Sequence, residues 1–204
     1  MKKFIGIIGS PSIETTNEKL LSLIKHAFQS EFELELISVR DWPMFNKPIS
    51  LELPAKIQTV VDKIDTADGV LISTAEYDHS VPAVLSNALA WLSYGQYPMV
   101  DKPTLILGTS YGRLGSSRAQ FHLRQMLNAP QLAANMMSGD GYLLSHALRA
   151  FTDDSEFARA IDRTDLETYI NRFIEFVDHN KRTDVQILQA KEVAANYDKR
   201  FIRR

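Results

Sequence analysis

Ser110 lies at the centre of a short motif that could carry nucleophilic chemistry. Residues 108–112 read Gly-Thr-Ser-Tyr-Gly, which matches the G-x-S-x-G elbow that presents the nucleophile of serine hydrolases. An apolar segment precedes the motif and a polar, basic helix start follows it, as an elbow requires. A triad would need a later acid and then a histidine, for which the chain offers Asp153 or Asp154 and then His179. No H-G-G-G-like segment offers a second oxyanion donor.

The same stretch also suits a loop that holds a ligand. Glycine lets the backbone approach a ligand closely, and short side chains leave N–H groups free to face polar ring atoms. Under this interpretation the contact residues are Ser110, Tyr111, Gly112 and Gly115. The motif alone does not choose between a nucleophile and a ligand loop.

A second polar loop, residues 9–17, follows the first apolar segment and opens a helix. Short hydroxyl side chains and the free N–H groups of a helix start make a good anion site. The residues concerned are Ser10, Ser12, Thr15, Thr16 and Asn17. The Walker pattern is absent, and Gly6 and Gly9 have the wrong spacing for a dinucleotide fingerprint. The loop therefore suits a bound phosphate group that need not belong to ATP or NAD. The alternative is a solvated turn in which Thr16 or Asn17 caps the helix.

A third polar loop joins another apolar segment to a helix that begins near Pro82. It carries Glu76, Tyr77, Asp78 and His79. An aromatic ring beside carboxylates in such a loop could pack on a flat ligand. His79 taken alone is better explained as an exposed loop histidine.

These loops must be positioned by a regular alternation of strands and helices. Apolar segments at residues 4–8, 32–39, 70–72, 104–107 and 142–144 read as strands, and helical periodicity separates most of them. This alternation predicts an α/β fold whose parallel sheet is covered by helices on both faces. Ligands of such sheets bind beyond the carboxyl ends of the strands, so the three loops are expected to meet there.

Composition limits the classes of function. The chain has 204 residues, a net charge of −2 and no cysteine, so disulfides and thiolate chemistry are excluded and no strong field attracts nucleic acid. No window approaches the roughly 18 apolar residues of a membrane span. We expect a cytoplasmic protein with one domain over residues 1–180, followed by a charged tail or terminal helix over 181–204.

Taken together, the three loops resemble those of the NADPH-dependent FMN reductase family. After the first strand that family shows G-S-x-R-x-x-S-x-N, matched here by Gly9, Ser10, Thr15 and Asn17. After the third strand it shows P-E-Y-N-x-S-x-P-x-x-L-K-N-A-x-D-W, matched by Glu76, Tyr77, Ser80, Pro82, Leu85, Asn87, Ala88 and Trp91. Around the fourth strand it shows K-P and then S-x-G-x-x-G, matched by Lys102, Pro103, Ser110, Gly112 and Gly115. The resemblance spans roughly residues 2–177.

The resemblance implies a fold and an activity. The fold is a flavodoxin-like three-layer sandwich with a five-stranded parallel sheet in the order 2-1-3-4-5. The activity is an FMN-dependent NAD(P)H oxidoreductase in which hydride passes from NADPH or NADH to flavin N5, and then to a flavin, quinone or azo acceptor by a ping-pong mechanism. The flavin does the chemistry, so no side chain need act as an acid or base and no metal is required. Members of the family are usually homodimers or homotetramers.

The resemblance also assigns site residues and exposes two departures. The FMN phosphate is expected in the loop of residues 9–17, and the isoalloxazine between residues 76–79 and 110–115. Ser12 stands where the family has arginine, which removes a cation from the phosphate pocket. Asp78 replaces asparagine and brings a negative charge near the ring. Two alternatives remain: a flavodoxin-like electron carrier or FMN-binding module without turnover, and a serine hydrolase using Ser110.

Overall fold

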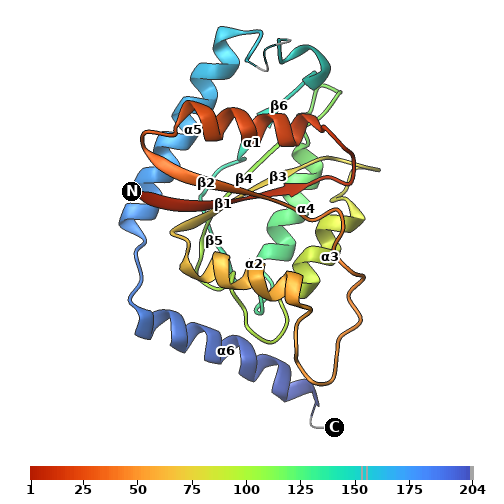
Figure 1. Cartoon of the computed structure of the whole chain (residues 1–204), viewed down its shortest axis with the longest axis vertical. Helices are drawn as coiled ribbons and strands as arrows, with labels where there is room; N and C mark the ends of the chain where they lie inside the picture. Colours follow the sequence, from red (N-terminus) through yellow and green to blue (C-terminus); the bar gives the residue numbers. More distant parts are fainter. Residues whose placement is uncertain (153, 155, 203–204) are drawn as a thin grey trace.

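The computed structural model of the chain forms a parallel sheet between two layers of helices (Figure 1). It describes residues 1–152, 154 and 156–202, and the side chains of these residues as far as Tyr197. Four long strands run in the order β2-β1-β3-β4, and all of them pair in parallel. They are β1 (Lys2–Gly9), β2 (Phe32–Ser38), β3 (Gly69–Thr74) and β4 (Pro103–Thr109).

The fifth position of the sheet is filled by two short strands in succession. β5 (Asn135–Met136) pairs with the start of β4, and β6 (Tyr142–Leu144) pairs with its end. Between them Gly139 and Gly141 have positive φ angles of 103° and 76°, which interrupt an extended strand. The predicted order 2-1-3-4-5 is therefore confirmed, with the fifth strand split in two.

Successive side chains along the strands point to opposite faces of the sheet and pack into two separate hydrophobic cores. On one face Phe4 and Leu71 pack against α1 (Thr16–Ala27) and α5 (Ala160–His179). On the other face Ile5 and Ile72 pack against α2 (Ala55–Thr66), α3 (Ala83–Leu92) and α4 (Ser117–Leu127). The strands are buried on both faces, as the continuous apolar segments of the sequence predicted. A short 3₁₀ turn, η1 (Ala147–Arg149), follows β6.

The loop after β2 is fastened to α3 by two residues of the third-strand motif. The Asn87 side chain accepts the Phe45 N–H at 2.7 Å and donates to the Pro43 carbonyl at 3.0 Å. Trp91 is buried and donates its indole N–H to the same carbonyl at 2.7 Å, while Phe45 packs edge-on against its ring. These two motif residues therefore shape the scaffold and lie away from the predicted ligand loops.

The last helix, α6 (Asp184–Ile202), lies apart from the two layers at the bottom of Figure 1. Thr183 and Gln186 form a reciprocal cap at its start, with N–H to side-chain oxygen distances of 3.0 and 3.3 Å. Ala194 packs on Tyr97 and Val100 of the loop between α3 and β4. Within the described ranges, no helix has the length and apolar character that crossing a membrane requires.

Candidate functional site

The loops that follow β1, β3 and β4 meet at the carboxyl edge of the sheet and enclose a cavity of about 600 Å³. The lining includes every residue that the sequence assigned to the site except Gly115: Ser10, Ser12, Thr15, Thr16, Asn17, Glu76, Tyr77, Asp78, His79, Ser110, Tyr111 and Gly112. It also includes Ile13, Glu14, Ala75, Thr109, Arg113, Leu114 and Arg118. Three segments far apart in the sequence thus form one site where the sheet topology predicts a ligand.

The first loop presents the start of α1 to this cavity. Thr15, and not Thr16 or Asn17, is the N-cap: its backbone is extended and its hydroxyl accepts the Glu18 N–H at 3.0 Å. The N–H groups of Thr16 and Asn17 have no carbonyl four residues earlier within the helix to accept them. The helix start can therefore offer these donors, with the positive end of its dipole, to an anion in the cavity.

Asn17 ties the three loops together from beneath. Its side chain is buried, and its Oδ1 accepts the Ser73 hydroxyl at 2.9 Å and the Thr109 N–H at 3.0 Å. The Thr16 hydroxyl lies 2.5 Å from the Thr109 hydroxyl. The first helix turn is thereby fixed to the ends of β3 and β4, which holds the floor of the cavity rigid.

The second loop turns tightly between Tyr77 and Ser80. These two residues exchange backbone hydrogen bonds of 3.1 and 2.9 Å, so that Asp78 and His79 are the two central residues of the turn. Their φ angles are 49° and 63°, in the left-handed region that such two-residue turns require and that usually selects Asn-Gly. Side chains other than glycine therefore adopt a costly conformation at the cavity mouth.

Glu76 holds the second loop against the start of α4. Its Oε2 accepts the N–H groups of Arg118 and Ala119 at 3.0 and 3.2 Å. Ser116, the N-cap residue of α4, has a left-handed backbone and its side chain makes no capping bond, so Glu76 supplies the missing acceptor. The Glu76 Oε1 also lies 3.7 Å from both the Arg118 guanidinium and His79 Nδ1. Glu76 thus ties the second loop to α4 while it lines the cavity.

The third loop is held by its backbone and leaves room beside Gly112. The Ser110 N–H and carbonyl bond to Leu144 and Ala147 at 3.1 and 3.0 Å. A Cβ at Gly112 would meet no atom within 4 Å, whereas one at Gly115 would approach the Leu143 backbone to 2.7 Å. Gly115 lies buried with a φ of 56°, so it lets the loop pack closely and does not line the cavity.

Ser110 is not arranged as a hydrolase nucleophile. Its hydroxyl donates weakly to the Gly112 carbonyl at 3.4 Å. His179 ends α5 at the opposite edge of the sheet, where its neighbour Asp178 pairs with Lys2 at 3.0 Å at the start of β1. Asp153 lies outside the described residues. The triad suggested by the motif therefore cannot form with His179.

The first and second loops also touch across the cavity. The Ser12 hydroxyl lies 3.1 Å from the Tyr77 hydroxyl, and both side chains are exposed. Exposed hydroxyls bond to each other weakly because water competes with them. A ligand can therefore separate this pair at low cost when it enters between the loops.

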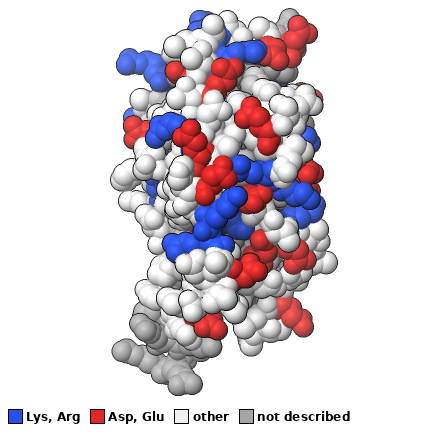
Figure 2. Space-filling view, turned by 90° about the vertical axis from the view of Figure 1, so that its left-hand side faces the viewer, with Lys and Arg blue, Asp and Glu red and all other residues white. Residues whose placement is uncertain are grey.

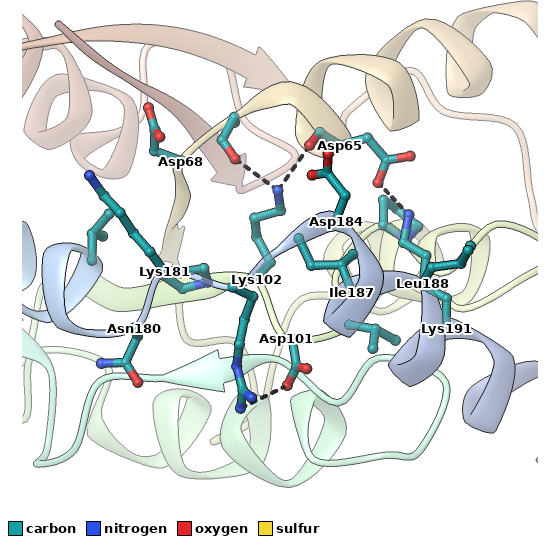
Figure 3. Close-up of a pocket in the computed structure, with 16 residues that line it drawn as sticks. Asp65, Asp68, Asp101, Lys102, Asn180, Lys181, Asp184, Ile187, Leu188 and Lys191 are labelled. Atoms are coloured by element: carbon teal, nitrogen blue, oxygen red, sulfur yellow. Dashed lines mark hydrogen bonds and ion pairs between the residues drawn. The ribbon is translucent and has the colours of Figure 1, made fainter.

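A second cavity, of about 480 Å³, lies at the amino edge of the sheet between the body of the molecule and α6 (Figure 3). Its charged groups bond to one another. Lys102 Nζ donates to the Asp65 and Ala67 carbonyls at 3.1 and 2.8 Å, and Lys191 pairs with the Asp65 carboxylate at 2.6 Å. Burial lowers the pKa of the Lys102 amine. Figure 2 shows this face, where basic and acidic side chains alternate. None of the predicted site residues lies here.

Known proteins share the sequence and the fold of this chain. A family model described as NADPH-dependent FMN reductase matches residues 2–148. The chain belongs to this family. Among relatives of the reductase, the NADH:(hydroxy)cinnamate reductase subunit CrdA of Vibrio ruber is 41% identical over 86% of this chain and 87% of its own. The NADH-dependent flavin reductase subunit 2 of Lactobacillus johnsonii is 32% identical over 88% and 100%. The solved structure of the NAD(P)H:(acceptor) oxidoreductase FerB of Paracoccus denitrificans has a TM-score of 0.79, with 25% identity over 88% and 99%.

The family resemblance read from the sequence is thus confirmed, with its fold, its FMN cofactor and its use of NAD(P)H. The chain is an oxidoreductase, which removes the alternatives of a hydrolase and of an electron carrier without turnover. The cavity fits FMN on its own chemistry. At one end it has free N–H groups of a helix start and small hydroxyl side chains, which suit a phosphate. At the other end it has open space beside Gly112 and the exposed rings of Tyr77 and Tyr111, which suit a flat ring system.

Sequence reasoning assigned Glu76 to ligand contact and did not find its role as the cap of α4. Nor did it find that Thr109 and Arg113 line the cavity. Thr109 falls inside the G-x-S-x-G stretch, so its position next to Ser110 could have indicated that it lines the cavity. The bonds from Glu76 to α4 span more than forty residues and depend on the sheet order, so no local pattern announces them.

Proposed function

We propose that the reductase binds FMN without a covalent link in the cavity at the carboxyl edge, and that it reduces a small flavin, quinone or azo acceptor by a ping-pong mechanism. The single observation that carries this proposal is the convergence of the three ligand loops around one cavity of about 600 Å³. Relatives are named as flavin reductases and as quinone reductases, which supports acceptors of this kind.

The phosphate of FMN is assigned to the start of α1. The N–H groups of Thr16 and Asn17 would donate to its oxygens, and the hydroxyls of Ser10, Ser12 and Thr16 would add further donors. Thr15 contributes through its backbone, because its hydroxyl already caps the helix. Asn17 acts mainly by holding this turn against Ser73 and Thr109.

The isoalloxazine is assigned to the space between residues 76–79 and 110–112. When bound, FMN supplies hydride transfer, accepting hydride from NAD(P)H at N5 and delivering it to the acceptor. Tyr77 and Tyr111 are 44% and 67% exposed, so their rings are available to cover a flat ligand. Asp78 is exposed on the same rim, and its carboxylate would disfavour negative charge on the reduced ring.

Assembly and location form the finer part of the proposal. Large apolar side chains that line the cavity are exposed, namely Ile13, Tyr111 and Leu114. Exposed apolar side chains at the mouth of a cavity favour contact with a second chain, and we propose a homodimer or homotetramer. We place the reductase in the cytoplasm, where NAD(P)H is supplied, with residues 1–180 as the FMN-binding domain.

A spectrum of the purified reductase, followed by steady-state kinetics, tests the proposal. We expect flavin absorbance that is released on denaturation, oxidation of NADH or NADPH, and parallel lines in double-reciprocal plots against a quinone. Ser110→Ala is the matched control for the hydrolase alternative and should leave esterase activity at background, as in the unaltered chain. A colourless preparation that takes up no added FMN would contradict the proposal.

A further inference from the structure

The first loop carries negative charge and no cation of its own, and the exposed Lys19 that follows Glu18 in α1 does not line the cavity. Residues 9–17 include Glu14 and contain neither lysine nor arginine, and Glu18 lies in the first turn of α1. Glu14 lines the cavity. An FMN phosphate at this helix start carries nearly two negative charges, so two nearby carboxylates would weaken its binding. A compensating positive charge must come from elsewhere in the fold.

Arg40 is the cation that the structure places against this loop. It lies just past the end of β2, and β2 pairs with β1, so it reaches the loop that follows β1. Its Nη2 donates to the Ser12 carbonyl at 2.7 Å and lies 3.9 Å from the Glu18 carboxylate. The side chain is 28% exposed, so water only partly screens its charge.

The guanidinium of Arg40 also has a buried nitrogen. Its Nε is buried and has no hydrogen-bond partner in the part of the chain that is described. Burying a donor without an acceptor is costly, so this arrangement needs a compensating benefit. Of the cationic lining residues, Arg113 belongs to the third loop and Arg118 to the first turn of α4, where it already lies beside Glu76 and His79.

We propose that Arg40 is a positioning residue of the phosphate site, which supplies from β2 the positive charge that the first loop lacks. It acts in two ways. Its bond to the Ser12 carbonyl fixes the loop conformation, and its charge offsets Glu18 beside the helix start. This inference rests on the proposed binding of FMN at α1.

Comparing FMN with riboflavin isolates the phosphate. Arg40→Ala should weaken FMN binding about tenfold, which is the size expected for the loss of one partly screened charge near a phosphate. Riboflavin, which has no phosphate, should bind the variant as it binds the unaltered chain. The dependence of FMN affinity on salt should become shallower. Flavin fluorescence quenching measures both dissociation constants.

Three further variants sharpen the test. Arg40→Lys should keep most of the affinity, and Ser12→Arg added to Arg40→Ala should restore it by placing a cation on the loop itself. Lys63→Ala is the matched control, because Lys63 pairs with Glu35 at 2.5 Å and neither residue lines the cavity. It should change neither dissociation constant.

The outcomes separate this inference from the proposed function. Equal weakening of FMN and riboflavin, or no rescue by Ser12→Arg, would overturn the assignment of Arg40 to the phosphate. Unchanged FMN binding in Arg40→Ala would overturn it as well, while the proposed function would stand. If the unaltered chain binds no FMN, the proposed function fails and this inference fails with it.

Discussion

Polar side chains gather at both edges of the sheet, and the two edges use them differently. At the amino edge the charged side chains have protein partners: Lys102 bonds to the backbone carbonyls that end α2, and Lys191 pairs with the Asp65 carboxylate. At the carboxyl edge the N–H groups at the start of α1 and the hydroxyl of Ser12 face an open cavity, with no strong protein partner. Both edges are polar, and they differ in whether their polar groups have partners within the protein.

Unpaired polar groups therefore mark a ligand site better than the amount of charge does. The amino-edge cavity has a comparable volume and a higher density of formal charge, yet its groups join α6 to the body of the reductase. Paired charges stabilise a contact and leave little interaction energy for a ligand. The carboxyl-edge cavity keeps donors free, and it does so on a floor made rigid by buried residues such as Asn17.

Removal of Asn17 from this floor should damage the reductase most. Asn17→Ala would leave the buried Thr109 N–H without its acceptor and should lower the free energy of unfolding by about 2 to 3 kcal/mol. FMN retention should fall as well, because three loops lose their common anchor. Urea denaturation and FMN titration measure the two losses, and Asn46→Ala, at an exposed loop position, is the control. Loss of stability with full FMN affinity would show that the floor does not shape the site.

A substitution at the amino edge should separate stability from binding. Lys102→Met would remove the donor to two carbonyls, although burial already lowers the pKa of this amine and offsets part of its benefit. We expect a loss of about 2 kcal/mol in the free energy of unfolding, with no change in the FMN dissociation constant. A weakened FMN affinity would break the distinction between the two edges.

Glu76 tests the second loop, where a carboxylate caps a helix from a distance. Glu76→Ala should cost about 1 kcal/mol of stability, the usual value of a helix cap, and should weaken FMN binding as the second and third loops separate. Glu76→Gln keeps one oxygen acceptor and should retain about half of that stability. If Ala and Gln behave alike in thermal denaturation, the two N–H bonds are not what holds α4.

Local patterns were sufficient for the architecture and for the loops. Apolar segments such as residues 70–72 are buried on both faces and mark their strands directly, and each polar loop follows one of them. The sheet order brings these loops together, so twelve of the thirteen predicted residues line the cavity. Gly115 does not, because its absent side chain lets the loop pack on Leu143 and does not accommodate a ligand.

Bonds between distant segments could not be read from the sequence. Arg40 reaches Ser12, Glu76 reaches α4, and Asn87 reaches the loop after β2, each across 28 or more positions. The fifth strand was predicted over residues 142–144, but the additional strand β5 has only two residues and carries no periodicity. Such features depend on which elements become neighbours, and this is settled only once the sheet is assembled.

Backbone strain at the carboxyl edge should have a more modest influence on stability. Asp78 has a φ of 49° in a turn that favours asparagine at this position. Asp78→Asn should therefore raise the free energy of unfolding by about 0.5 kcal/mol, since asparagine adopts the left-handed region more readily. The same change removes a negative charge from the rim, so FMN should bind more tightly and the reduced flavin should be easier to form. Thermal denaturation and a redox titration measure both. A less stable variant with an unchanged potential would mean that Asp78 is held there by contacts that outweigh both its strain and its charge.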